Sequence, residues 1–151
     1  ENPLHAKMAC ECALAMRLAL TQLHEKWHRE KKPLWDFCVG ISTGEVVVGN
    51  LGAKDRFDYT VIGDTVNLGA RLESINRLYG TKIIVDETTK ENAGKDFTFR
   101  KLDRVRVKGK EKPTIIYEFL TNGDDEKTHE FLQDFENGLA RYESGARPRP
   151  W

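Results

Sequence analysis

The stretch that decides the fold runs from residue 56 to residue 77 and reads Arg-Phe-Asp-Tyr-Thr-Val-Ile-Gly-Asp-Thr-Val-Asn-Leu-Gly-Ala-Arg-Leu-Glu-Ser-Ile-Asn-Arg. It predicts a strand over 57–62, a turn at Gly63 and Asp64, and a helix over about 64–79. The apolar residues of that helix recur at helical spacing and form one stripe, namely Leu68, Leu72, Ile75 and Tyr79. Gly80 then stands where a C-terminal cap is wanted.

Two polar residues lie one turn apart on the flank of this helix, Asn67 and Arg71. Arg71 has no carboxylate three or four residues away on either side, whereas Arg77 has Glu73 four residues before it. A positioned guanidinium without a local counter-ion, beside an amide, suits an anionic ligand such as phosphate. The alternative is an ordinary solvated arginine.

The rest of the chain predicts a mixture of helices and strands without a sustained repeat. Alternation predicts a strand from Trp35 to Ser42, and the valines at 46–48 predict a short buried run. The remaining predictions are a helix over 4–29, a strand over 82–85, a short helix capped by Asp86, a hairpin of 97–108 with 114–119, and a helix over 125–142.

Composition limits the partners. Among 151 residues, 24 Lys and Arg balance 24 Asp and Glu, so no global field favours nucleic acid or an anionic membrane surface. Three cysteines, Cys10, Cys12 and Cys38, fit no zinc or disulfide framework and indicate reduced thiols. No apolar run reaches the ~20 residues needed to cross a bilayer. We therefore expect a cytoplasmic segment without membrane contact, although a parent protein could be anchored elsewhere.

Residues 24–28 read His-Glu-Lys-Trp-His, a literal H-E-x-x-H on a predicted helix. Two histidines four residues apart can share a zinc ion, with the glutamate as general base. The usual H-x-x-G-x-x-H continuation is absent, although a distant carboxylate could replace the third ligand. We treat the pair as surface histidines and keep a zinc hydrolase as a remote alternative.

Two further residues could complete an anion site. Thr60 ends a strand before the glycine turn and offers both a donor and an acceptor, as reading a base edge requires. Lys108 lies beside Gly109 in the hairpin connection and could hold a terminal phosphate. The alternatives are a β-branched strand residue and a solvated turn lysine.

The segments Gly-Ile-Ser-Thr-Gly-Glu-Val-Val-Val-Gly-Asn-Leu-Gly at 40–52 and Asp-Tyr-Thr-Val-Ile-Gly-Asp-Thr-Val-Asn-Leu-Gly-Ala-Arg-Leu-Glu at 58–73 strongly resemble the class III nucleotidyl cyclase catalytic domain. The likeness runs from the first helix to about Phe119. It implies an α+β, ferredoxin-like fold that works as a head-to-tail homodimer with active sites at the interface. The implied reaction converts a nucleoside triphosphate to a 3′,5′-cyclic monophosphate and pyrophosphate, with two divalent cations, Mg²⁺ or Mn²⁺.

The resemblance also implies a role for each candidate residue. Asn67 would orient the ribose, Arg71 would stabilise charge developing at the α-phosphate, and Lys108 would contact the β- and γ-phosphates. Thr60 occupies the purine-reading position, helped by the backbone of Val61. Adenylate cyclases tend to have aspartate or threonine there and guanylate cyclases cysteine, so we expect ATP as the substrate and cyclic AMP as the product.

The chain also departs from the family pattern. The two metal-binding aspartates, and the lysine that completes purine recognition, would lie upstream of residue 1, together with the first strand, first helix and following hairpin. We therefore expect residues 1–120 to be the C-terminal portion of a catalytic domain that is inactive alone. A catalytically silent nucleotide-binding or dimerisation domain is the alternative. Residues 121–151 would form a helical extension, either a plain amphipathic helix or the start of a helical repeat.

Overall fold

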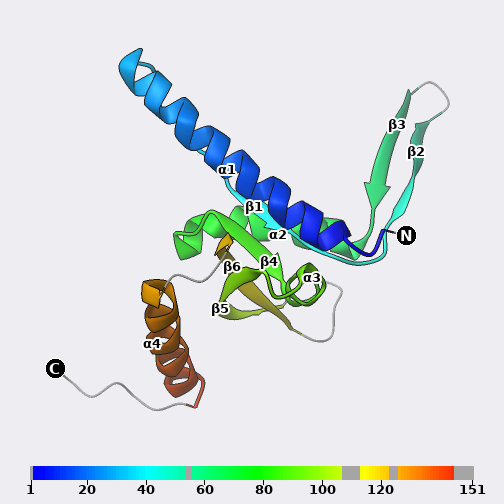
Figure 1. Cartoon of the computed structure of the whole chain (residues 1–151). Coiled ribbons are helices and arrows are strands. Elements are labelled where there is room, and N and C mark those ends of the chain that lie inside the picture. Colours follow the sequence, from blue (N-terminus) through cyan, green and yellow to red (C-terminus); the bar gives the residue numbers. More distant parts are fainter. Residues whose placement is uncertain (1, 54–55, 107–112, 123–125, 145–151) are drawn as a thin grey trace.

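The computed structural model describes residues 2–53, 56–106, 113–122 and 126–144. Figure 1 shows a long helix and a two-stranded arm rising from a small α/β body, with a last helix packed at its side. The elements in chain order are α1 (His5–Arg29), β1 (Val39–Ile41), β2 (Val47–Ala53), β3 (Arg56–Ile62), α2 (Asp64–Tyr79), β4 (Ile83–Asp86), α3 (Glu87–Ala93), β5 (Phe97–Val105), β6 (Thr114–Asn122) and α4 (Glu126–Glu143).

The body is built on a mixed four-stranded sheet in the order β1-β4-β6-β5. β1 pairs in parallel with β4, opposing Gly40 to Ile84, while β6 runs antiparallel to both β4 and β5. The register of β5 on β6 shifts twice, between Thr98 and Phe99 and between Lys101 and Asp103. This mixture of helices and strands agrees with the expected α+β class.

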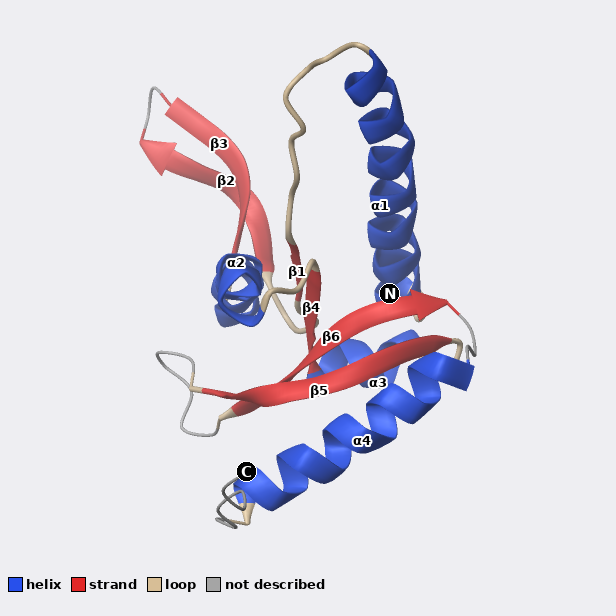
Figure 2. Ribbon diagram, turned by 90° about the vertical axis from the view of Figure 1, so that its left-hand side faces the viewer, coloured by secondary structure: helices blue, strands red, loops and turns tan. Residues whose placement is uncertain are grey.

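β4 is the central strand of the core, and all four of its residues are buried. Because successive strand residues point to opposite faces, its side chains enter two different clusters. Ile83 and Val85 pack with Cys10 of α1 on one face, whereas Ile84 packs with the α2 residues Leu68 and Leu72 on the other. Figure 2 shows the sheet seen from the side, with these helices around it. The core stripe expected for α2 is confirmed.

Most predicted helices end close to where the sequence indicated. α2 spans the predicted residues 64–79, and Gly80 is left-handed with φ +65°, which a glycine adopts without strain. Asp86 caps α3 by accepting a hydrogen bond from Thr89 N at 2.9 Å. On α1, Cys10 is buried and Cys12 exposed, as their two-residue spacing requires. Burial raises the pKa of the Cys10 thiol to about 11, with a further contribution from Glu11.

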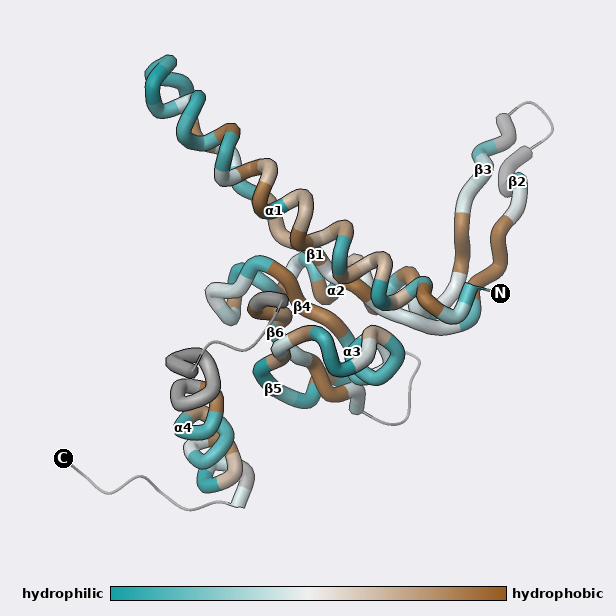
Figure 3. Tube along the Cα trace, viewed as in Figure 1, coloured by the Kyte–Doolittle hydropathy of each residue, from teal (hydrophilic) through white to brown (hydrophobic). Residues whose placement is uncertain are grey.

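Two predictions around β1 and β2 were wrong. The strand expected from Trp35 to Ser42 is confined to the three residues of β1, and Trp35 is 73% exposed. The valines at 46–48 do not form a buried run: Val47 is 71% exposed and Val48 53%. The reason is that β2 pairs only with β3, in a separate two-stranded sheet that stands away from the body as an arm. Figure 3 shows hydrophobic residues along both strands of this arm.

None of the described helices combines the length and the apolar character needed to span a bilayer.

Candidate active site

The predicted base-reading residues lie on β3, just before it enters α2. Thr60 is paired with Gly49 of β2 and Val61 with Val48, and both side chains are exposed. Gly63 then begins the helix, since its carbonyl oxygen accepts hydrogen bonds from Val66 N at 3.1 Å and Asn67 N at 3.3 Å. The strand and the helix that carry the candidate residues are therefore joined by a single glycine.

Asn67 and Arg71 are both exposed on α2, next to the buried Leu68 and Leu72. Within the described part of the chain, neither side chain makes a hydrogen bond or an ion pair. Arg71, which has no carboxylate three or four residues away in the sequence, therefore also has no ion-pair partner in space among the described residues. An amide and a guanidinium one turn apart, both free to donate, can bind an anionic ligand.

The structure leaves one of these expectations untested and differs from another. Lys108 lies outside the described residues. The suggested partnership of Glu73 with Arg77 is not formed among the described side chains, and Glu73 instead accepts a hydrogen bond from Ser74 at 3.3 Å. A hollow of about 410 Å³ between α1, α2 and the loop after β1 includes Val61 in its lining, but not Thr60, Asn67 or Arg71.

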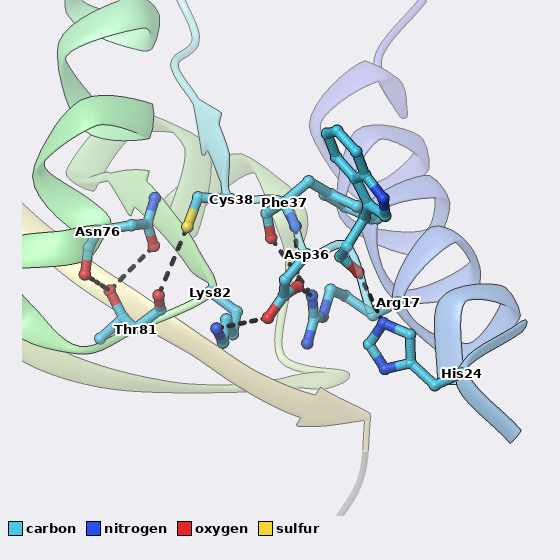
Figure 4. A network of polar contacts seen from close by, with 9 residues as sticks. Arg17, His24, Asp36, Phe37, Cys38, Asn76, Thr81 and Lys82 are labelled. Atoms are coloured by element: carbon cyan, nitrogen blue, oxygen red, sulfur yellow. Dashed lines mark hydrogen bonds and ion pairs between the residues drawn. The ribbon is translucent and has the colours of Figure 1, made fainter. Parts of the chain in front are cut away.

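The helix that carries Asn67 and Arg71 is held very close to β1. A Cβ on Gly40 would lie 2.3 Å from both Gly69 O and Glu73 N, so only glycine permits this approach of strand and helix. The buried Asn76 adds a polar link, donating to Val39 O at 3.0 Å and accepting from Thr81 Oγ1 at 2.9 Å. Figure 4 shows Asn76 and Thr81 facing each other. These contacts hold α2 in a fixed position against β1, and we refer to this helix as the platform.

The C-terminal end of α2 is tied to β5. Tyr79 donates a hydrogen bond from its hydroxyl to Asp103 Oδ2 at 2.7 Å. Burial, followed by this hydrogen bond and the charge of Asp103, raises the pKa of Tyr79 to about 12. β5 ends at Val105, three residues before Lys108, so this contact joins the platform to the strand that leads toward the predicted phosphate lysine.

A charged cluster fastens the segment before β1 to the body. Asp36 pairs with Arg17 of α1 and with Lys82 at 2.6 Å, and it accepts a hydrogen bond from Phe37 N at 2.8 Å. Figure 4 shows the carboxylate between the two cations. The hydrogen bond from Lys82, together with Arg17, holds the pKa of Asp36 well below its usual range despite an opposing effect of burial.

The H-E-x-x-H residues lie near the end of α1. His24 Nε2 is 2.7 Å from Trp35 O, so this ring nitrogen is already hydrogen-bonded to the backbone. His24, Glu25 and His28 line an open hollow of about 630 Å³ together with Arg29 and Leu34. No group of three or more His, Cys, Asp or Glu side chains suited to a metal occurs in the described ranges. The zinc hydrolase alternative is not favoured.

Comparison with known proteins decides the family. The family model described as "Adenylate and Guanylate cyclase catalytic domain" matches residues 2–121. This chain belongs to that family. Adenylate cyclase 1 of Rhizobium meliloti (strain 1021) is 38% identical to this cyclase chain over 116 residues, which cover 77% of the chain and 17% of that protein. An adenylate cyclase of Anabaena cylindrica is 34% identical over 119 residues, which cover 72% of the chain and 24% of that protein.

Solved structures support the same cyclase fold. The guanylyl cyclase Cya2 and the adenylyl cyclase CyaB from P. aeruginosa each align with a TM-score of 0.66 and 34% identity. Each alignment covers 80% of this chain, but only 60% and 61% of the respective solved chain. Because one neighbour is named for each nucleotide, overall similarity does not decide the purine. The chain spans under a quarter of the length of the two curated relatives.

Several contacts that position the cyclase platform were not singled out from sequence. Gly40 lies in the quoted Gly-Ile-Ser-Thr-Gly segment, and it approaches the α2 backbone more closely than any side chain would allow. That segment was the available signal. Asn76 gave none, because one amide in an amphipathic helix looks like a surface residue.

Proposed function

We propose that the protein containing this chain is an adenylate cyclase that converts ATP to 3′,5′-cyclic AMP and pyrophosphate. The observation that carries the proposal is the pair Asn67 and Arg71. Both are exposed and without a partner among the described residues, and both are presented by a helix locked against β1 in a chain of the cyclase family.

Each residue has a proposed role in this reaction. The ribose 3′-oxygen attacks the α-phosphorus, a new O–P bond forms, and the bond to the leaving pyrophosphate breaks. Asn67 orients the ribose for that attack, and Arg71 neutralises the charge that develops on the α-phosphoryl oxygens. Lys108 contacts the β- and γ-phosphates.

Thr60 and Val61 read the adenine from β3. The Thr60 hydroxyl accepts a hydrogen bond from the exocyclic amino group of adenine, and the Val61 backbone assists. The exposure of both residues beside the start of α2 supports this proposal. GTP presents a carbonyl oxygen in place of that amino group, so its recognition requires a different hydrogen-bond pattern.

The described residues do not fit the two divalent cations that the reaction uses, because they include no suitable cluster of His, Cys, Asp or Glu. The family resemblance assigns the metal-binding aspartates to sequence upstream of residue 1. On this proposal the 151 residues alone are inactive, residues 1–120 form the C-terminal portion of the catalytic domain, and 121–151 form an extension.

The proposed active form is a homodimer with its sites at the interface. The arm of β2 and β3 supports this, because it presents large exposed apolar side chains well away from the body, namely Val47, Val48, Tyr59 and Ile62. An apolar surface of this kind is typical of protein–protein contacts.

The test is product formation by the full-length protein. Purified protein is incubated with ATP or GTP and Mn²⁺, and the products are identified by mass spectrometry. Cyclic AMP with an equal amount of pyrophosphate is expected, and Asn67→Ala should greatly reduce it. Ser74→Ala, at another exposed position of the same helix, is the matched control. Nucleotide binding without product would instead identify a catalytically silent domain.

A further inference from the structure

The loop between β1 and β2, residues 42–46, is hydrogen-bonded to one buried carboxyl group, that of Asp86. Asp86 is 2% exposed and accepts hydrogen bonds from Ser42 Oγ at 2.9 Å and from Thr43 N at 3.4 Å. The Thr43 hydroxyl adds a contact of 2.8 Å to Thr89 Oγ1 on α3. Since burial makes an unpaired carboxyl group costly, these contacts fix the loop relative to β4 and α3.

The same loop also lies close to the junction between β3 and α2, at Gly63 and at Thr65. A Cβ on Gly44 would lie 2.4 Å from Thr65 Oγ1, in the first turn of α2. A Cβ on Gly63 would lie 3.2 Å from Glu45 O and 3.4 Å from Val46 Cγ1. The loop therefore packs closely against the point where the arm becomes the helix.

We infer that Asp86 is a positioning residue of the site. Through Ser42 and Thr43 it holds loop 42–46, and the loop sets the angle between the arm carrying Thr60 and the helix carrying Asn67 and Arg71. This inference rests on the proposed cyclase function. It assigns to Asp86 more than the capping of α3, because the cap uses only Oδ1 and Thr89 N, whereas Oδ2 is directed to Ser42.

Two variants separate positioning from capping. Ser42→Ala removes the hydrogen bond from Ser42 Oγ to Asp86 Oδ2 and leaves the Thr43 N contact and the α3 cap intact. Asp86→Ser keeps a good N-cap residue for Thr89 N but removes Oδ2, the oxygen that accepts the hydrogen bond from Ser42. Thr88→Ala, at an exposed position of α3, is the matched control.

The readout is the ratio of kcat/KM for ATP to kcat/KM for GTP in the full-length protein. A loss of folded protein lowers kcat/KM for ATP and for GTP in proportion, so their ratio stays the same. A changed angle between the arm that carries Thr60 and the helix that carries Arg71 alters that ratio. We expect Ser42→Ala and Asp86→Ser each to lower the ratio about 2- to 10-fold, the effect of one hydrogen bond, and the double variant to lower it no further. Thr88→Ala should leave it unchanged.

Hydrogen exchange gives a second readout that does not depend on activity. In Ser42→Ala, amides of residues 58–67 should exchange faster while those of α3 keep their protection. Unchanged exchange at 58–67 together with an unchanged ATP-to-GTP ratio would overturn the inference and leave Asp86 as a cap. If the wild-type protein forms no cyclic nucleotide, the proposed function fails, and with it the catalytic part of the inference. Exchange then still decides whether Asp86 holds the loop.

Discussion

Gly40 in β1 and Gly69 in α2 meet backbone to backbone. A Cβ on Gly40 would lie 2.3 Å from Gly69 O, whereas a Cβ on Gly69 would lie 3.8 Å from Gly40 O, an ordinary contact. The two glycines of one contact are therefore not equivalent. Only the strand residue has to be glycine for α2 to reach its position.

This asymmetry predicts opposite outcomes for two single methyl additions. Gly40→Ala should push α2 away from β1, lower the melting temperature and reduce cyclic AMP formation at least tenfold, because a displacement of about 1 Å at a catalytic group can cost 100-fold. Gly69→Ala should be tolerated, and should gain up to about 1 kcal/mol from helix propensity. Thermal unfolding and steady-state rates check both. Equal effects of the two variants would contradict the proposed packing.

Thr60→Cys should weaken the preference for ATP over GTP. The thiol is a poorer hydrogen-bond acceptor than the hydroxyl, so the adenine amino group loses about 1 kcal/mol, which corresponds to a roughly fivefold lower ratio of kcat/KM values. Ser74→Ala, at an exposed position of α2 with no assigned role, is the control. An unaltered ratio in Thr60→Cys would remove Thr60 from purine recognition.

The ion pairs of Asp36 should make the stability of the fold fall at acid pH. Its pKa in the folded protein lies below the ordinary value of 3.8, chiefly because of Lys82 and then Arg17. The ion pairs therefore stabilise the fold above about pH 4, and this contribution is lost as the pH falls through the folded-state pKa. Urea unfolding should find Asp36→Asn less stable than wild type at pH 7, with the difference shrinking below pH 3.8. A constant difference across that range would contradict the assignment.

Phe135 should fasten α4 to the sheet. The guanidinium of Arg100 lies 4.5 Å from its ring centroid, while Arg100 also pairs with Glu118 at 2.5 Å. Phe135→Ala should lower the free energy of opening α4 by about 0.5–2 kcal/mol, and Phe135→Tyr should retain it. Limited proteolysis followed by mass spectrometry measures this opening. Since the family match ends at residue 121, cyclic AMP formation should be unchanged, and a matching loss of activity would place α4 within the catalytic unit.

Local patterns predicted the elements whose partners are close in sequence. The period of Leu68, Leu72 and Ile75 placed α2 correctly, since a helix is specified by its own residues and by Gly80 at its end. The valines at 46–48 misled, because an apolar run indicates that something covers a strand but not what covers it or where. The described chain leaves that surface exposed.

The same distinction applies to the candidate site. The sequence could propose Thr60, Asn67 and Arg71 as candidates because they fall within one continuous motif. The residues that fix their geometry are brought together from distant parts of the chain: Gly40 against α2, Asn76 against Val39, and Asp86 against Ser42. Contacts that depend on the packing of β1 against α2 and β4 have no local signature, so sequence periodicity could not reveal them.

The most direct test of the central claim is the rate of cyclic AMP formation from ATP and Mn²⁺ by full-length Arg71→Ala, compared with Arg77→Ala. Both arginines are exposed on α2 and lack an ion pair among the described residues, but only Arg71 is assigned to the reaction. Loss of an electrostatic stabiliser of the transition state predicts a kcat about 100- to 1,000-fold lower for Arg71→Ala, with Arg77→Ala close to wild type. Equal turnover by the two variants would contradict the account.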